Sequence, residues 1–243
     1  MGDLLVAWVH NTESVSYSWF HSIHELTMHQ IVEHPNTFGG VLPIRYGTGG
    51  LPEARNTAAA KFLASDCEWL LWVDTDMGFG PTAAAELLAA ANAERPVVGA
   101  LCFVNGEVSR DGYGGYITRP YPTIYRWARN PNGDTGFVPD LHYKRDELVK
   151  CDATGSAFVL VHRSVFEKVH AKCGPNWYTP ILEPNSGRPF SEDMSFCIRL
   201  VEVGVPVHVH TGVRTTHLKP VWLQESHLDD WLAAHPEPSP FPA

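Results

Sequence analysis

The chain has 243 residues, of which 44% are hydrophobic and 19% are charged, and it carries a formal net charge of −9. This is the composition of an ordinary globular protein with room for one large core, and its acidic balance argues against non-specific binding to nucleic acid or anionic membranes. Five cysteines without a CxxC pair favour a reduced compartment, and no apolar run reaches the roughly 20 residues of a membrane span, so we expect a cytoplasmic protein without membrane insertion.

The first hundred residues alternate between short apolar runs and amphipathic segments. Val15, Trp19, Ile23 and Leu26 recur at steps of three and four residues, which is typical of one buried helix face. We predict strands at 4–9, 39–46, 69–73 and 96–104, and helices over about 14–33, from near Pro52, and from Pro81 to about 93. This alternation predicts an α/β fold with a mostly parallel central sheet flanked by helices.

The second half of the chain is less regular. Residues 105–145 are rich in Gly, Pro, Tyr and Arg and show no helical period. "GSAFVLVHRSVFEKVH" predicts a strand and a short helix, and "VPVHVH" alternates like a strand. "SEDMSFCIRLVEVG" predicts a helix between Ser191 as N-cap and Gly204 just past the end. We therefore expect a single domain over 1–235 and a Pro-rich tail over 236–243.

Two carboxylates follow directly on the apolar run at 69–73. Asp74 and Asp76 stand where ligands bind in open α/β sheets, beyond the carboxyl end of a strand. Two hard oxygen donors at such a place suit Mg²⁺ or Mn²⁺ bridging a diphosphate. An EF-hand is excluded because Ala85 occupies the position of its bidentate Glu, and a P-loop is excluded because the chain lacks GxxxxGK[ST]. One capping and one solvated aspartate is the alternative.

Five further segments contain short motifs that follow one another in a fixed order along the chain. The segments are "ARNTAAAKFLASDCEWLLWVDTDM", "VVGALCF", "CDATGSAFVLVHRSVFEKV", "SEDMSFCIRLVEVGVPVHVH" and "TTH". Over residues 4–217 the chain resembles metal-dependent glycosyltransferases of the GT-A fold, particularly the inverting family 2 type. The resemblance implies a UDP- or GDP-sugar donor, Mn²⁺ or Mg²⁺ on its diphosphate, a nucleotide-binding half over about 1–104 and an irregular acceptor-side half over about 105–235.

The same resemblance assigns roles to individual residues. Asp76 and His217 would ligate the metal, with Asp74 contacting it through water or contacting the donor ribose, and Asp193 would be the catalytic base. The other donor-binding residues would be His10, Thr12, Arg55, Asn56, Thr75, Gly155 and Ser156, and the acceptor-binding residues would be Trp177, Tyr178 and Glu192. Each role has a plainer alternative: Asp193 as a first-turn helix charge, His217 and Arg55 as surface residues, and Trp177 as core packing.

The acceptor is left open between several classes. A stretch over 110–129 interleaves Arg110, Arg119, Arg126 and Arg129 with Tyr113, Tyr116, Tyr121, Tyr125 and Trp127. Aromatic faces and cations suit sugar rings or stacked bases, and a hairpin packing its own aromatic residues is the alternative. The acidic charge favours a protein or glycan hydroxyl over a hydroxymethylated base of phage-type DNA. A non-catalytic nucleotide-sugar-binding domain also stays open, whereas the missing QxxRW motif argues against a processive synthase.

Overall fold

The computed structural model describes residues 3–11, 15–109, 116–219, 225 and 233. Thr12, Arg110, Tyr113 and the predicted tail at 236–243 lie outside the described residues. The chain divides into two compact units, one of residues 1–104 and 121–218 and the other of residues 105–120 and 219–243. Among the described residues, no helix has both the length and the apolar character needed to cross a bilayer.

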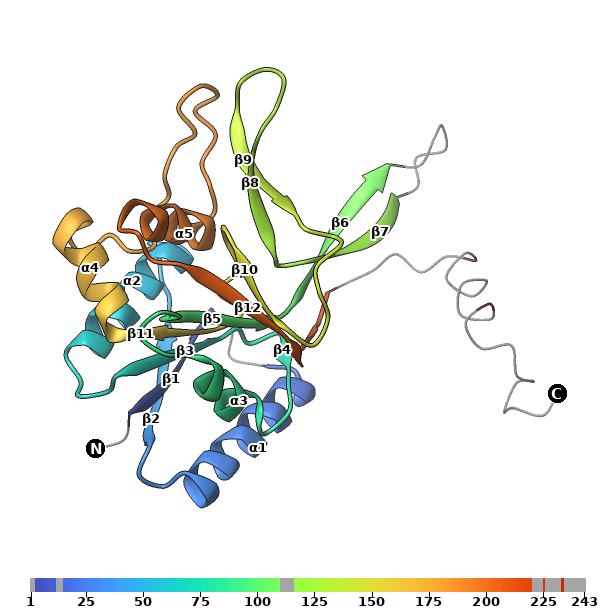
Figure 1. Ribbon diagram of the computed structural model, residues 1–243. Helices are drawn as coiled ribbons and strands as arrows, with labels where there is room; N and C mark the ends of the chain where they lie inside the picture. The colour runs from blue at the N-terminus through green and yellow to red at the C-terminus, as the bar shows by residue number, and fades with distance from the viewer. Residues whose placement is uncertain (1–2, 12–14, 110–115, 220–224, 226–232, 234–243) are drawn as a thin grey trace. The chain divides into compact units, whose positions relative to one another are not determined.

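A seven-stranded sheet forms the centre of the first unit (Figure 1). Its strands, in spatial order, are β10 (Leu148–Cys151), β12 (Val207–Arg214), β5 (Val97–Leu101), β11 (Phe158–His162), β3 (Trp69–Val73), β1 (Leu4–His10) and β2 (Phe38–Arg45). The predicted α/β fold class is confirmed. The sheet is mixed rather than mostly parallel, however, because β11 runs antiparallel to both β3 and β5, and β10 runs antiparallel to β12.

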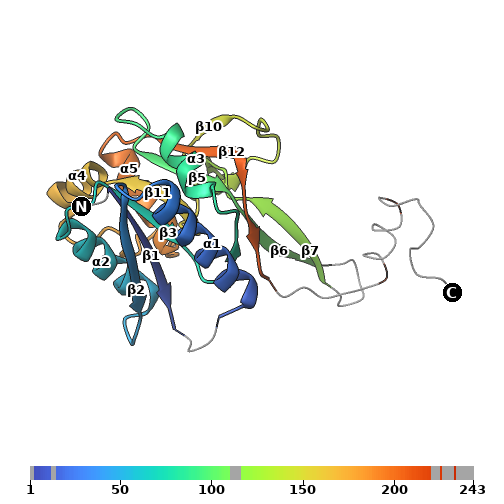
Figure 2. The ribbon, with the colours of Figure 1, turned by 90° about the horizontal axis from the view of Figure 1, so that it is seen from below.

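Helices cover both faces of this sheet (Figure 2). They are α1 (Tyr17–Glu33), α2 (Gly50–Leu63), α3 (Ala83–Ala90), α4 (Arg163–Cys173) and α5 (Glu192–Glu202). One core cluster joins the sheet to α2, α4 and α5, and a second joins it to α1 and α3. Alternate residues of a strand face opposite sides, so Leu70 and Trp72 of β3 enter the first cluster while Leu71 and Val73 enter the second.

The helix ends show how local sequence sets the element boundaries. The Ser16 hydroxyl accepts a hydrogen bond from the Trp19 backbone N–H at 3.1 Å, so α1 begins at Tyr17. Val15, which was predicted on the buried helix face, therefore precedes the helix and is exposed. Helix α5 begins after Ser191 as predicted. It ends before Gly204, whose φ of 69° is the left-handed conformation that glycine adopts easily at this position.

Three two-stranded sheets complete the described structure. They are β4 (Met77–Gly78) with β13 (Thr216–His217), β6 (Phe103–Ser109) with β7 (Tyr116–Pro122), and β8 (Tyr125–Arg129) with β9 (Thr135–Pro139). The stretch that showed no helical period therefore contains β-strands, which agrees with the hairpin interpretation of its aromatic residues.

The strand directions bring several chain segments to one edge of the central sheet. Strands β1, β3, β5 and β12 are parallel to one another through their pairings, so their carboxyl ends share that edge. The antiparallel β11 begins there, because its Phe158 pairs with Val73 at the end of β3. The predicted location of Asp74 and Asp76 at the carboxyl edge is confirmed.

Candidate active site

The acidic triplet forms a turn between β3 and β4. The Asp74 backbone N–H donates to the Ala157 carbonyl at 2.8 Å, and the Met77 N–H donates back to the Asp74 carbonyl at 3.2 Å. The side chains of Asp74 and Asp76 are 31% and 37% exposed. Both carboxylates are therefore anchored by a structured turn and still reach solvent at the sheet edge.

Arg55 connects this turn to the start of α5. It lies on the buried face of α2, only 2% exposed. Its Nη2 is 2.8 Å from Asp74 Oδ1 and its Nε is 3.5 Å from Glu192 Oε1. The guanidinium carbon lies 5.0 Å from the Trp72 ring centroid and 5.8 Å from that of Tyr178. Arg55 is thus the buried cation of an acidic cluster and not a helix-surface residue.

The cluster carries more carboxylates than its one arginine neutralises. Burial raises the pKa of Asp74, an effect that Arg55 opposes and Asp76 reinforces. Burial, followed by the charge of Asp193, likewise raises the pKa of Glu192. For Arg55, burial alone works against the charged form, but Asp74 and the other neighbouring acids raise its pKa above the ordinary value. The carboxylate of Glu192, predicted to bind the acceptor, faces Arg55, and its acceptor role stays a prediction.

The raised pKa of Glu192 leads to a prediction about pH. Because the folded protein holds the proton of Glu192 more tightly than the unfolded chain does, this group's contribution to stability is present below its unfolded pKa and lost as pH rises through the folded pKa. We expect the unfolding free energy of Glu192→Gln, relative to the wild type, to increase as pH rises from 4 to 7. Urea unfolding across this range measures it, with the exposed Glu167→Gln on α4 as control. A relative stability that stays flat or decreases would contradict the prediction.

Asp76 pairs with His217, which lies 141 positions later in the chain. His217 Nε2 is 3.0 Å from Asp76 Oδ2, and the short β13–β4 ladder sets His217 opposite Met77. The other ring nitrogen, Nδ1, is 2.6 Å from the Phe103 carbonyl, which can only accept, so Nδ1 carries the hydrogen. A neutral ring then presents the Nε2 lone pair to a carboxylate oxygen. A proton on Nε2 or a metal ion between the two atoms would satisfy this pair.

The donor set fits a metal ion that completes its coordination from the substrate. Among the residues that the structure describes, no group of three or more His, Cys, Asp or Glu side chains is placed to hold a metal. Asp76 and His217 supply two ligands, and Asp74 is instead bonded to Arg55. One carboxylate and one imidazole suit Mn²⁺ better than Mg²⁺, which prefers oxygen ligands alone. The remaining positions would belong to a diphosphate and water.

Asp193 stands in the first turn of α5 with one oxygen held and one oxygen without a partner. Its Oδ1 accepts hydrogen bonds from the Met194 backbone N–H, at 2.8 Å, and from the Ser191 hydroxyl. Its Oδ2 faces Gly155, where a methyl group would lie 3.5 Å from Oδ2 and 3.7 Å from Thr123 Cγ2. No hydrogen bond reaches Oδ2 from any residue in the described ranges.

The remaining donor-side predictions divide into two groups. His10 ends β1, and Gly155 and Ser156 directly precede β11, so all three lie at the same edge as Thr75 of the acidic turn. Asn56 is used differently: its Oδ1 accepts from the Tyr178 N–H at 2.8 Å and its Nδ2 donates to the Thr179 hydroxyl at 3.2 Å. The amide of Asn56 thus fixes the Tyr178 backbone and the Thr179 side chain and keeps one N–H and one lone pair for another partner.

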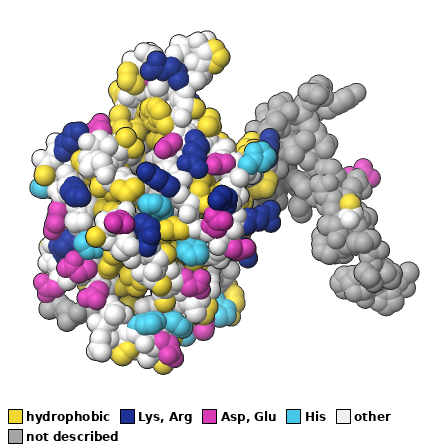
Figure 3. Space-filling view, in the orientation of Figure 1, with side chains coloured by type: hydrophobic (Ala, Val, Ile, Leu, Met, Phe, Trp, Pro, Cys, Tyr) yellow, Lys and Arg dark blue, Asp and Glu magenta, His cyan; other side chains and the backbone are white. Residues whose placement is uncertain are grey.

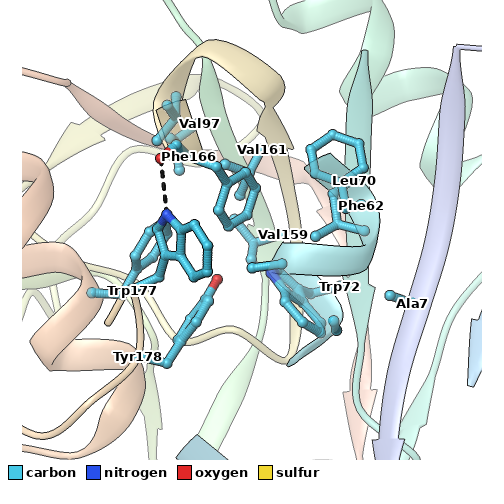
Figure 4. Close-up of a cluster of buried hydrophobic side chains, with 14 of the residues drawn as sticks. Ala7, Phe62, Leu70, Trp72, Val97, Val159, Val161, Phe166, Trp177 and Tyr178 are labelled. Atoms are coloured by element: carbon cyan, nitrogen blue, oxygen red, sulfur yellow. Dashed lines mark hydrogen bonds between the residues drawn. The ribbon is translucent and has the colours of Figure 1, made fainter. Parts of the chain in front are cut away.

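Trp177 and Tyr178 lie in the core, not on an acceptor-facing surface (Figure 4). They are 1% and 0% exposed. The Trp177 indole N–H donates to the Phe166 carbonyl at 2.8 Å, and the Tyr178 ring meets Trp72 edge-on. Trp177 is therefore core packing, the alternative noted from sequence. Tyr178 contributes indirectly, as one of the two rings around Arg55.

Some contributors to the site were not identified from the sequence. The Phe103 carbonyl orients His217, the Ser191 hydroxyl donates to Asp193, and Thr123 lies beside Gly155. These contacts join segments that no local pattern relates. A signal did exist for Arg55, because it falls on the helix face that also carries the buried Ala58, Ala59 and Phe62, and a lone arginine in an apolar stripe indicates a buried partner.

Comparisons with known proteins add a likeness of fold. No protein-family model and no curated protein sequence matches the chain. Among solved structures, it is similar to A197 from STIV, at 13% identity and a TM-score of 0.51, over 90% of this chain and 87% of that chain. This likeness concerns the fold alone.

Two glycosyltransferase structures show weaker likenesses. The catalytic domain of Drosophila beta1,4galactosyltransferase 7, in complex with xylobiose, matches at 13% identity and a TM-score of 0.47, over 90% of this chain and 72% of that chain. A glycosyltransferase involved in the glycosylation of the major capsid of PBCV-1 matches at 12% identity and a TM-score of 0.41, over 95% of this chain and 98% of that chain. TM-scores below 0.5 support no statement about this chain. The comparisons therefore support an α/β fold similar to that of A197. In this chain, the acidic turn follows β3, His217 lies in β13 and Asp193 lies in the first turn of α5.

Proposed function

We propose that the protein is a metal-dependent glycosyltransferase that moves a sugar from a nucleotide-diphosphate sugar to an acceptor hydroxyl. The pairing of Asp76 with His217 carries this proposal, because a carboxylate and an imidazole held 3.0 Å apart are two ligands that one divalent cation can share. The resemblance of five sequence segments to GT-A glycosyltransferases supports the same function. A cation held there would stabilise the charge that develops on the leaving diphosphate.

Asp193 is the proposed general base. The acceptor oxygen attacks the anomeric carbon, the bond from that carbon to the diphosphate oxygen breaks, and the acceptor proton passes to Asp193 Oδ2. The hydrogen bonds from Met194 and Ser191 to Oδ1 fix the carboxylate so that Oδ2 is the oxygen left to accept a proton. A single displacement of this kind inverts the anomeric configuration.

The donor nucleoside has a candidate cavity beside β1. A hollow of 180 Å³ is lined by Arg45, Tyr46, the glycine-rich residues 47–50 and the first turns of α2. His10 adjoins it, because the Tyr46 N–H donates to the His10 carbonyl at 3.0 Å. We propose that this hollow receives the nucleoside while the diphosphate extends to Asp76.

A protein or glycan acceptor is preferred to DNA. Arg126, one of the cations that kept the DNA interpretation open, is bound to Asp140 at 3.1 Å and donates to the Lys150 carbonyl at 2.7 Å. Trp127 from the same stretch packs edge-on against Phe137. These side chains hold the β8–β9 hairpin together and are not displayed as a phosphate-binding row.

The function is tested with a panel of UDP- and GDP-sugars, with and without Mn²⁺, scored for binding and for slow donor hydrolysis. Metal-dependent binding and hydrolysis of one donor would support the transferase. Metal-dependent binding without any hydrolysis or transfer would indicate the non-catalytic nucleotide-sugar-binding domain instead.

The metal pair gives the next prediction. Removing divalent ions with EDTA should weaken nucleoside diphosphate binding at least tenfold, since Asp76 and His217 would hold an ion that neutralises the diphosphate charge. Asp76→Asn should bind as weakly as the chelated wild type and should no longer respond to Mn²⁺. Isothermal calorimetry measures both, with the exposed Asp66→Asn as control. Equal affinity of the wild type with and without Mn²⁺ would rule out the metal role.

A further inference from the structure

Two hairpins of the first unit lie side by side (Figure 1). Residues of both line a solvent-open cavity of 420 Å³. One is β8–β9. The other is residues 181–190, in which Leu182 bridges to Pro189 and the Phe190 N–H donates to the Ile181 carbonyl at 2.9 Å. The cavity is lined by residues 128–130 and 134–138 of the first hairpin and by Ser186 and Arg188 of the second.

Glu183 holds the two hairpins together. It is 1% exposed, and its Oε1 accepts hydrogen bonds from the backbone N–H and the hydroxyl of Thr135, both at 3.1 Å. Its Oε2 accepts from the N–H groups of Asn185 and Ser186 and from the Ser186 hydroxyl. These bonds, with the Ser186 N–H first among them, lower the pKa of Glu183 to about 2. The carboxylate is saturated, so it fixes the cavity walls without competing for a ligand.

Two arginines line this cavity without a partner of their own. Among the described residues, no hydrogen bond or ion pair involves the guanidinium group of Arg129 or of Arg188. The carboxylate nearest in the lining, Asp134, already accepts from the Asn130 side-chain amide at 3.0 Å. Gly136 lies beneath Arg188, where a Cβ would be 3.8 Å from Nη2, so the floor there is open. Figure 3 shows basic side chains at this projecting end with hydrophobic ones close below.

Both hairpins lead from the cavity to the proposed base. The 181–190 hairpin ends immediately before Ser191 and Asp193, and the chain enters β8 just after Thr123, which, like Asp193, lies beside Gly155. At roughly 3.3 Å per extended residue, Arg129 lies up to about 20 Å from Thr123. A ligand that spans the cavity and the base must therefore be elongated.

We propose that this cavity binds an anionic group, a carboxylate or a sulfate, on an extended acidic glycan whose hydroxyl reaches Asp193. Guanidinium forks match these oxyanions in a bidentate manner, while the Phe137 ring and the polar groups of Asn130 and Ser186 suit a sugar. Two arginines gathered at one cavity, and not a basic stripe, favour a glycan over nucleic acid. This inference rests on the proposed function, because it treats the ligand as the acceptor.

The test measures binding to the full chain in EDTA, without donor, by calorimetry. The probes are a hexamer of galacturonate, a heparin-derived hexasaccharide, neutral maltohexaose and a single-stranded oligonucleotide. We expect one acidic glycan to bind at least tenfold more tightly than maltohexaose; which one does so identifies a carboxylate or a sulfate as the anion. Arg129→Gln and Arg188→Gln should each weaken that binding about tenfold, the usual scale for a charge-assisted hydrogen bond. The exposed Arg145→Gln, outside the cavity, should change it less than twofold.

Several outcomes would overturn the inference. The inference is wrong if neither acidic glycan binds more tightly than maltohexaose. It is also wrong if the Arg129→Gln/Arg188→Gln double variant, shown by its melting curve to be folded, binds the acidic glycan as tightly as the wild type. Arginine-dependent binding of the oligonucleotide alone would assign the cavity to nucleic acid. Donor hydrolysis with Mn²⁺ is scored separately. If it fails while glycan binding depends on both arginines, the transferase proposal is wrong and the cavity stands as a glycan site.

Discussion

Asp193→Asn is expected to leave metal-dependent nucleotide-sugar binding nearly unchanged while transfer falls by about 10²–10⁴-fold, the scale of a lost general base. An asparagine oxygen can still accept from the Met194 N–H and the Ser191 hydroxyl, so the start of α5 keeps its structure. Its amide nitrogen would then occupy the place of Oδ2 beside Gly155, and it cannot take a proton. Initial transfer rates and donor titrations on the same preparation separate the two effects.

The control for this variant must lie outside the acidic cluster. Glu192→Gln is unsuitable, because Glu192 faces Arg55 at 3.5 Å and its loss changes the charge balance around Asp74. Asp66→Asn is exposed after α2 and should retain full transfer. Near-normal transfer by Asp193→Asn would show that Asp193 is not the base. Parallel loss of donor binding and transfer would make it a donor-binding or structural carboxylate.

Arg55→Met should lower the free energy of unfolding by about 3–5 kcal/mol, the usual loss when one partner of a buried ion pair is removed. The variant leaves Asp74 and Glu192 facing each other's charge without the guanidinium, and it removes the cation from between Trp72 and Tyr178. Urea unfolding at pH 7 measures the loss. The exposed Arg145→Met should stay within about 0.5 kcal/mol of the wild type.

A rescue variant distinguishes lost charge pairing from lost packing. Adding Asp74→Asn and Glu192→Gln to Arg55→Met replaces the ion pairs with neutral groups of similar shape, and should recover much of the stability. If the triple variant is no more stable than Arg55→Met alone, the cost comes from packing around Trp72 and Tyr178. A loss below about 1 kcal/mol for the single variant would show that Arg55 is not the buried partner of these acids.

The sequence by itself determined the main helices and strands of the first hundred residues and the position of the acidic turn. The apolar run of β3 and the two aspartates after it are consecutive, so their place at a strand's carboxyl end follows from local pattern. The N-cap Ser191 and the terminal Gly204 of α5 are likewise local signals, because cap geometry depends on one or two residues. These local signals are enough to place Asp193 in the first turn of a helix.

The tertiary structure alone decided which side chains meet. Strand direction has no local signature, so the antiparallel insertion of β11 between β3 and β5 was not predictable from its apolar run. The pairing of β13 with β4 brings His217 to Asp76 and to the Phe103 carbonyl across more than a hundred residues. Trp177 suits a sugar-stacking surface and a core equally well by residue type, and only packing against Phe166 places it inside. A side chain's chemistry is local, whereas its partner and its exposure are set by the pairing of distant segments.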